Sequence, residues 1–281
     1  MALIPPFFLN CVVSIGIPSI APQNSVNWIG TGFIVGRPIA DDAEPKKFHT
    51  FVATNKHALA GKSQIILRFN SLDGTRVFDY PALLELNGEM IWVGHSSTDV
   101  DVAVFNINPT VLEKDGAEFS FFHLDKHVMG VTELKAEGVS EGDGVFVLGF
   151  PMGIVAPQRK NVIARMGAIA RIRDVLDGHQ SSFLIDANIF PGNSGGPVVI
   201  RPDMNCIQDT KAINRAALIG IVKSYLPFQD IAISQQTGNP RVIFEENSGL
   251  ALVETVDSIQ VTVEECFRTK VTTNPMRAAS H

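Results

Sequence analysis

The stretch Phe190-Pro191-Gly192-Asn193-Ser194-Gly195-Gly196-Pro197 places a serine on a tight turn between small residues. Glycines on both sides let the backbone adopt conformations that a Cβ would forbid, and they let a substrate carbonyl approach the main chain closely. In such a turn the N–H groups of Gly192 and Ser194 can point at one spot beside the serine hydroxyl, as an oxyanion hole requires. The alternative is an ordinary turn between strands, because Gly, Asn, Ser and Pro dominate turns for conformational reasons alone. A nucleophilic serine needs a base and a group that orients the base. Residues elsewhere in the chain therefore decide between a nucleophile and an ordinary turn.

The base is expected to be a histidine, because histidine titrates near neutral pH. Of the seven histidines, His57 directly follows an apolar run, Phe51–Thr54, whereas His49 lies in the middle of the same run. A strand end holds a side chain rigidly at the rim of a sheet, so we predict that His57 is the base. A lone histidine at such a position can equally be a structural residue.

A carboxylate is needed to fix the tautomer of the base and to stabilise the imidazolium. The segment Thr98–Val104 offers Asp99 and Asp101. Asp101 leads into an apolar strand and is predicted to be buried and hydrogen-bonded, whereas Asp99 lies in a polar loop and is predicted to be solvated. Taken alone, Asp101 is also a common type of turn residue at a strand start.

Short β-rich runs separated by turn signals recur along the chain, without long helices between them, and this pattern favours a sandwich or barrel over a parallel sheet. One helix is predicted from Val256 to Thr269, capped by Thr255, with an apolar face typical of packing on a barrel. The segment Pro109–Val131 is less regular and is predicted to join two halves. The predicted strands are Cys11–Ile17, Trp28–Gly36, Phe48–Thr54, Ser63–Phe69, Val77–Leu86, Glu89–Val93, Val100–Ile107, Gly144–Leu148, Val162–Ile172, Ser182–Ile185, Val198–Ile200, Ala217–Tyr225 and Gly249–Leu252.

Composition narrows the class of protein. The 281 residues are 45% hydrophobic and 19% charged, as in ordinary globular proteins, and the net charge of −6 argues against a general nucleic-acid binder. Cys11, Cys206 and Cys266 are far apart and form neither a metal-ligand pair nor a disulfide framework. No uninterrupted apolar run reaches about 18 residues. We therefore expect a cytoplasmic protein with no membrane span.

Taken in order, these motifs resemble the trypsin/chymotrypsin-like serine peptidases, and most closely the HtrA/Deg-type branch. The matches are collinear from about residue 10 to residue 255, and they include the order His57, Asp101, Ser194. The segments that carry the resemblance are Gly30–Ile34, Thr54–His57, Asp101–Val104, Gly149–Gly153, Asp186–Pro197, Leu218–Ile221 and Ser248–Ala251.

The resemblance implies an all-β fold of two antiparallel six-stranded Greek-key β-barrels with a C-terminal helix. The expected domains are residues 1–120, carrying His57 and Asp101, residues 121–255, carrying Ser194, and a helix and tail over 256–281. HtrA/Deg enzymes generally carry a PDZ domain after the peptidase unit, and too few residues follow Leu252 for one to be expected here.

The resemblance also implies a serine endopeptidase that needs no metal or cofactor, in which His57, Asp101 and Ser194 are catalytic. The implied oxyanion hole is Gly192, Asn193 and Ser194. Because Asn188 is neutral at the expected base of the pocket, small or medium apolar side chains are expected before the cut bond rather than Arg or Lys. The implied pocket residues are Asn188, Phe190, Val222, Lys223, Ser224 and Gly249.

Two departures from secreted digestive relatives bear on activation. Asn193 stands where those relatives have an aspartate that pairs with a newly cut N-terminus, so classical zymogen activation is not expected. Ala58 stands where they have a disulfide cysteine, in agreement with a reducing compartment. Two alternatives stay open: a silent peptide-binding scaffold, and a latent peptidase whose loops Gly153–Lys160 and Leu226–Arg241 leave the oxyanion hole unformed until a partner docks. The expected partners are a protein or peptide substrate and either an activating protein or further copies of the chain.

Overall fold

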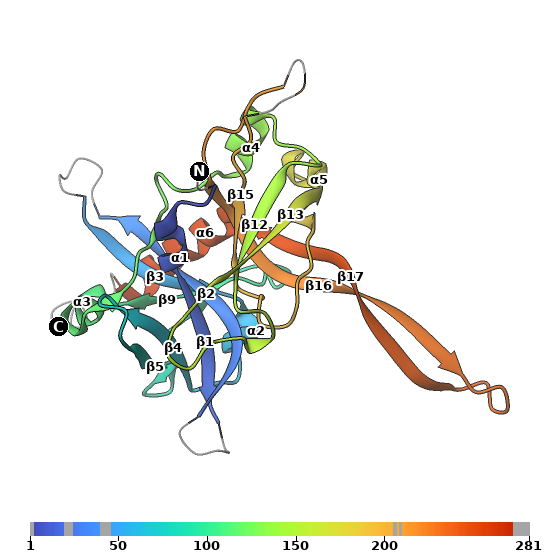
Figure 1. The fold of residues 1–281 in the computed structure, drawn as a ribbon, viewed down its shortest axis with the longest axis horizontal. Helices are drawn as coiled ribbons and strands as arrows, with labels where there is room; N and C mark the ends of the chain where they lie inside the picture. The colour runs from blue at the N-terminus through green and yellow to red at the C-terminus, as the bar shows by residue number, and fades with distance from the viewer. Residues whose placement is uncertain (1–2, 20–24, 40–45, 205–206, 208–209, 272–281) are drawn as a thin grey trace.

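The computed structural model describes residues 3–19, 25–39, 46–204, 207 and 210–271. Cys206 and the predicted tail from residue 272 onward lie outside the described residues. The chain is mostly β, and Figure 1 shows two groups of strands side by side, with the N-terminal half in blue to green and the C-terminal half in yellow to red.

The first half forms a nine-stranded sheet in the order β10-β4-β1-β2-β3-β9-β8, with β5 on β4 and β11 on β2. Its longer strands pair antiparallel in the order β5-β4-β1-β2-β3-β9. Strands β6 (Glu85–Leu86) and β7 (Glu89–Met90) form a separate hairpin. The strands of the large sheet are β1 (Val12–Pro18), β2 (Val26–Pro38), β3 (Phe48–Thr54), β4 (Gln64–Ser71), β5 (Val77–Leu83), β8 (Val93–Gly94), β9 (Ala103–Ile107), β10 (Ala117–Glu118) and β11 (Phe122–His123).

The second half closes into a barrel in the order β12-β13-β14-β17-β16-β15, in which every pair is antiparallel. The predicted all-β, chymotrypsin-like fold class is confirmed. The barrel strands are β12 (Gly144–Gly149), β13 (Ile163–Arg171), β14 (Ser182–Asp186), β15 (Pro197–Ile200), β16 (Ala217–Ile233) and β17 (Pro240–Thr255).

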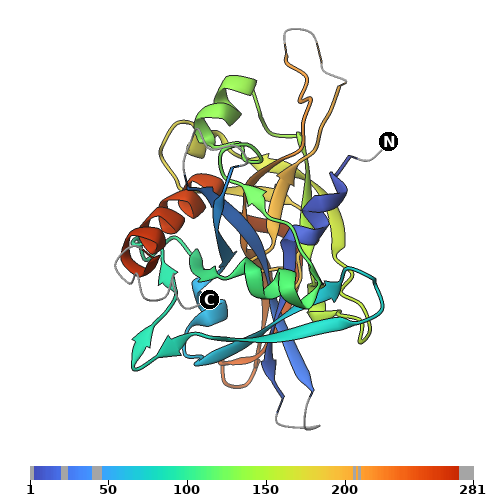
Figure 2. The same ribbon diagram turned by 90° about the vertical axis from the view of Figure 1, so that its left-hand side faces the viewer.

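Helix α6 (Val256–Cys266) confirms the predicted C-terminal helix, but it ends before Thr269, where the π-helical turn η2 (Phe267–Val271) follows it. Thr255 is at the N-cap position, but its side chain makes no capping hydrogen bond. Ile259 and Val263 are fully buried in a core shared with Phe51 of the first sheet and Leu218 of the barrel. In Figure 2, α6 is the red helix along the side of the molecule. It therefore packs against both halves of the chain. None of the helices in the described ranges is long and apolar enough to cross a membrane.

The remaining helices are short, and the sequence did not indicate them because one or two turns give no readable periodicity. Several lie where chain segments reverse between strands, and α2 directly follows β3. They are α1 (Pro6–Cys11), α2 (Lys56–Leu59), α3 (Pro109–Asp115), α4 (Val131–Glu137), η1 (Pro151–Gly153) and α5 (Arg173–Leu176).

The prediction of a loop over Leu226–Arg241 is wrong. Strand β16 continues to Ile233 and β17 begins at Pro240, so the two strands form a ribbon that projects from the barrel (Figure 1). Pro227, Pro240 and Gly238 suggested a loop. Proline is tolerated on a strand with a free edge, and the β-branched residues between these positions favour extended backbone.

Candidate active site

His57 and Asp101 are brought together by the way β3 ends. The strand stops at Thr54, and His57 lies in the first turn of α2. Its Nδ1 is 2.5 Å from Asp101 Oδ2, and its backbone N–H donates to Asp101 Oδ1 at 3.3 Å. The Asp101 side chain is 19% exposed and that of His57 is 55% exposed. Asp99 is exposed, as predicted.

The pKa of Asp101 is lowered from its ordinary value. Burial by itself would raise this pKa, but the hydrogen bond and the charge attraction of His57 and the His57 backbone N–H outweigh burial. The carboxylate is therefore ionised at neutral pH, and it can accept from His57 Nδ1–H and hold one tautomer of the ring.

The backbone of Asp101 is fixed on both sides by residues that the sequence did not single out. Asn55 Nδ2 donates to the Asp101 carbonyl at 2.7 Å, and the Asp101 N–H donates to Glu254 Oε1 at 3.2 Å. Glu254 is fully buried, and Lys223 Nζ lies 2.9 Å from its Oε1. Lys223 also donates to the Asp99 carbonyl. The predicted pocket residue Lys223 thus has its ammonium group in an ion pair behind Asp101.

The turn that carries Ser194 depends on two glycines. Gly192 has a φ of 96°, and a Cβ there would lie 2.4 Å from the Phe150 carbonyl oxygen. Gly195 has a φ of 81°, and a Cβ there would lie 2.1 Å from the Thr31 carbonyl oxygen. Both positions are in the left-handed region that favours glycine. Any other residue at either position would displace the turn or the strand β2.

Thr31 connects this turn to the first sheet. Its buried hydroxyl donates to the Gly192 carbonyl at 2.6 Å and accepts from the Phe150 N–H at 3.0 Å. Its backbone N–H donates to the Ser194 carbonyl at 3.0 Å. The sequence signal for this residue was its place in Gly30-Thr31-Gly32, where missing side chains allow another backbone to approach closely.

The hydrogen bonds of the turn leave two donors free. Asn193, one of the predicted oxyanion-hole residues, donates its N–H to the Phe190 carbonyl at 3.0 Å, so this N–H is already in a hydrogen bond. The N–H groups of Gly192 and Ser194 have no hydrogen-bond acceptor among the described residues. Within the same residues, the Ser194 hydroxyl and His57 Nε2 form no hydrogen bond with each other.

Ser194 and His57 are nonetheless neighbours through the chain segments that bear them. Gly195 follows Ser194, and a Cβ on Gly195 would lie 2.5 Å from Thr54 Oγ1, three residues before His57. Thr54 Oγ1 in turn donates to the Thr31 carbonyl at 2.8 Å. The structure therefore brings the end of β3 and the serine turn together.

The other predicted pocket residues lie on chain segments, some of which are joined to one another by hydrogen bonds. The Ala187 N–H donates to the Gly249 carbonyl at 2.8 Å, and Asn247 Nδ2 donates to the Ile189 carbonyl at 2.5 Å. Asn188 is exposed, Ser224 is half-buried, and Val222 is buried. Phe190 is half-buried under the Arg165 guanidinium, whose carbon is 5.1 Å from the ring centre. A cation beside Phe190 was not foreseen from the sequence.

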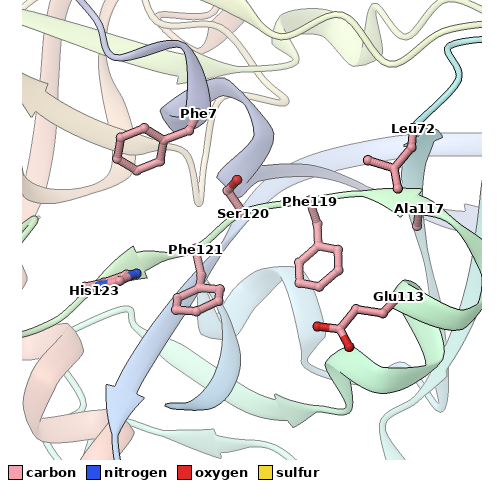
Figure 3. Close-up of a pocket in the computed structure, with 8 residues that line it drawn as sticks. All are labelled: Phe7, Leu72, Glu113, Ala117, Phe119, Ser120, Phe121 and His123. Carbon is pink, nitrogen blue, oxygen red and sulfur yellow. The ribbon is translucent and has the colours of Figure 1, made fainter. Parts of the chain in front are cut away.

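Two observations concern other kinds of site. A depression of about 460 Å³ is lined by none of the predicted site residues. Figure 3 draws the side chains that line it. It is lined by Phe7, Leu72, Glu113, Ala117, Phe119, Ser120, Phe121 and His123. In the described part of the chain, no group of three or more His, Cys, Asp or Glu side chains is placed to hold a metal ion.

Solved structures with a similar arrangement include proteases, at low sequence identity. An HtrA-type protease, AlgW, with a tripeptide has a TM-score of 0.47 at 19% identity, with 93% of this chain and 61% of that chain covered. The protease domain of MamO from Magnetospirillum magneticum has a TM-score of 0.46 at 15% identity, with 90% and 96% covered. Rv3671c from M. tuberculosis, in an inactive form, has a TM-score of 0.45 at 18% identity, with 94% and 89% covered. The chain thus spans less than two thirds of the AlgW chain.

A search of curated proteins found no match. The family model for the trypsin-like peptidase domain matches residues 30–204, which is more than half of the chain. That range contains His57, Asp101 and Ser194. The chain belongs to the trypsin-like peptidase domain family.

Proposed function

We propose that this protein is a serine endopeptidase in which Ser194 attacks the carbonyl of a peptide bond. His57 takes the proton from the Ser194 hydroxyl as general base and then gives it to the leaving amine as general acid. Asp101 holds the ring in the required tautomer and stabilises the imidazolium. The free N–H groups of Gly192 and Ser194 bind the oxyanion, and each such donor typically contributes about 3–4 kcal/mol to lowering the barrier.

The single observation that carries this proposal is the 2.5 Å contact between His57 Nδ1 and Asp101 Oδ2. A carboxylate on Nδ1 leaves Nε2 to accept a proton, so the pair is set up as a base. Its position at the end of β3, beside the turn of Ser194, supports the assignment of the serine as the group whose proton is taken.

The supporting residues are part of the proposal. Thr31 holds the Gly192 carbonyl and the Ser194 carbonyl, and so supports the turn from which both oxyanion donors project. Asn55 and Glu254 hold the backbone of Asp101 from opposite sides. Lys223 neutralises Glu254, so that the buried carboxylate is paired next to Asp101.

We further propose that the two catalytic halves correspond to residues 1–120 and 121–255, and that the pocket before the cut bond prefers small or medium apolar side chains. The neutral Asn188 supports this preference. So does the Arg165 cation over Phe190, because a positive charge at the rim disfavours a substrate Arg or Lys.

A fluorophosphonate probe tests the function directly, since it forms a covalent bond only with an activated serine. The full chain is expected to be labelled on Ser194, as located by mass spectrometry of the digested protein. Ser194→Ala and His57→Ala are expected to abolish labelling, whereas Ser181→Ala, at an exposed serine outside the predicted site, is expected to leave it intact. Equal labelling of Ser194→Ala and the parent chain would show that the assignment is wrong.

One observation favours a second candidate, a latent peptidase. In the described residues Ser194 and His57 form no hydrogen bond with each other. Hydrogen bonds of this kind are often long before substrate binds. A latent enzyme would label slowly alone and quickly with an activating partner, whereas labelling that is already complete in the isolated protein would exclude latency.

A further inference from the structure

The depression drawn in Figure 3 combines aromatic rings with one carboxylate. Phe7 of α1, and Phe119 and Phe121 of the segment between β10 and β11, supply the rings. Glu113 of α3 is exposed, and its carboxylate has no hydrogen bond or ion pair among the described residues. Burial lowers the pKa of His123, so this ring is uncharged at neutral pH. The lining therefore carries one negative charge beside three aromatic rings.

These groups favour a ligand that is both positively charged and apolar. The face of an aromatic ring attracts a cation, and a carboxylate without a partner adds to this attraction. Leu72 is 71% exposed and Phe7 is 37% exposed, so apolar surface of the depression is open to water. An open surface of this kind fits side chains presented by a polypeptide better than it fits an enclosed small molecule.

The ribbon of residues 226–248 carries side chains of this kind. Arg241 is its only basic residue. Directly after it come three apolar residues, Val242 (49% exposed), Ile243 (59%) and Phe244 (55%). The Arg241 side chain is exposed and forms no hydrogen bond or ion pair with the described residues. The chain thus exposes a basic residue beside apolar ones, which is the chemistry that the depression favours.

The ribbon also gains from a partner that surrounds one of its edges. From Pro227↔Asn247 outward β16 pairs with β17 alone, and an isolated two-stranded ribbon is at best marginally stable in water. Successive residues of β17 point to opposite faces of the ribbon. A flat surface would cover one face only, whereas a depression that receives the edge of β17 contacts both sets of side chains.

The acidic residues of the ribbon do not oppose this contact. Glu245 and Glu246 lie nearer the barrel than Arg241, and Glu245 accepts a hydrogen bond from the Tyr225 hydroxyl at 2.8 Å. Asp230 is on β16, the strand away from the edge that would enter the depression. The positive charge of Arg241 is therefore the charge at the entering end.

The ribbon and the depression of one molecule are too far apart to meet. Figure 1 shows α3, which borders the depression, and the ribbon on opposite sides of the molecule. The contact therefore joins two copies, with the ribbon of one on the depression of the next. Because two different surfaces meet, the contact can repeat until the copies close into a ring or continue as a filament.

We propose that the depression is a self-association site that takes the outer end of β17 from a second copy. Arg241 of the second copy pairs with Glu113, and the apolar residues that follow Arg241 pack on the aromatic rings. The contact uses no residue of the candidate active site, so it does not depend on the proposed function.

Sedimentation velocity of the full chain over a dilution series of about 1 to 100 μM tests the contact, because a small interface gives weak association. We expect the average mass to rise above that of the monomer as the concentration increases. Arg241→Glu and Glu113→Arg each bring like charges together, and each is expected to weaken association at least about tenfold. Glu89→Arg, at an exposed glutamate outside the depression, is expected to leave association unchanged. All three positions are exposed, so each variant should keep the parent melting temperature.

A mixture of the two weakened variants tests the pairing itself. When Arg241→Glu protein is mixed with Glu113→Arg protein, opposite charges meet at every contact between unlike copies. The same holds when both substitutions are placed on one chain. We expect the mixture and the double variant to recover the association of the parent chain.

A parent chain that stays monomeric across the dilution series would overturn the proposal. Association that Glu113→Arg leaves unchanged would overturn it too, because the contact would then lie between two ribbons or on another surface. So would single variants that both associate weakly and show no recovery in the mixture, because Arg241 and Glu113 would then not act as a pair.

Discussion

Thr31 shows how much of the site depends on one buried hydroxyl. It bonds to the Gly192 carbonyl and the Phe150 N–H across the gap between β2 and the serine turn. Thr31→Val keeps the shape and leaves both groups without this partner, so we expect a stability loss of about 1–3 kcal/mol. Because the oxyanion donors lose their support, kcat should fall about tenfold to a hundredfold with little change in KM.

Steady-state kinetics and urea unfolding of Thr31→Val test this expectation. Thr50→Val is the matched control, since Thr50 is a buried threonine of the same sheet whose hydroxyl donates to the Ile107 carbonyl at 3.0 Å. The control should lose stability and keep its kcat. An equal fall of kcat in both variants would mean that Thr31 acts on stability alone.

Glu254 and Lys223 should shift the pH dependence in opposite directions. Glu254→Gln leaves a cation near Asp101 and His57, which disfavours the imidazolium, so the acidic limb of the kcat/KM profile should move to lower pH. Lys223→Met leaves a buried anion, so the limb should move to higher pH, at a stability cost of about 3–5 kcal/mol. Shifts of the same sign in the two variants would contradict an electrostatic role.

Among the elements, α1 contacts a histidine, His127, whose protonation we expect to weaken the fold. The His127 ring lies 5.0 Å from that of Phe7 and 4.4 Å from that of His123. Burial, then the charges of His123 and Lys126, lower the pKa of His127 from 6.5 to about 4. A base with a lowered pKa binds its proton more tightly in the unfolded chain, so its contribution to stability is complete above pH 6.5 and is lost as the pH falls toward 4.

Thermal unfolding between these two pH values tests this contribution. The melting temperature should fall as the pH is lowered, and His127→Asn should flatten the fall. Asparagine keeps an acceptor for the His123 N–H, which now donates to His127 Nδ1 at 3.1 Å. An unchanged slope in the variant would assign the pH dependence to other groups.

The strands show where sequence patterns are reliable. Phe48–Thr54 was predicted with its observed ends because a β-branched run stops at a polar segment, whereas Val77–Leu86 divides into β5 and β6. The ribbon formed by residues 226–248 of β16 and β17 was not predicted, because neither of its faces is buried. A strand gives an alternating apolar and polar sequence only where one of its faces is buried. The pairing of β16 with β17 depends on residues of both strands, so the sequence of either strand alone does not predict it.

In the whole molecule, α6 joins the two sheets that supply the site. Ile259→Ala should cost about 2–5 kcal/mol through lost burial and the cavity that remains. Val261→Ala is the control, because Val261 is 55% exposed on the same helix. Urea unfolding should show one transition in both variants, displaced only in Ile259→Ala. Two separate transitions in Ile259→Ala would show that the halves unfold independently.

The order His57, Asp101, Ser194 could be found from the sequence because each residue sits in a short local pattern. Glu254 could not, since it reaches Asp101 from 153 residues away and reads as an ordinary strand-end carboxylate. Thr31 was visible only as a residue between glycines. Residues that contact each other only because the two sheets pack together leave no local pattern in the sequence of either segment.

The most direct test of the account is whether His57 and Ser194 act as a unit. The measurement is kcat on one peptide substrate for the parent chain, Ser194→Ala, His57→Ala and the double variant. We expect each single variant to lose about as much as the double, on the order of 10⁶-fold, because a nucleophile without its base and a base without its nucleophile are equally inactive. Losses that multiply in the double variant, or a Ser194→Ala protein that retains the parent kcat, would contradict the account.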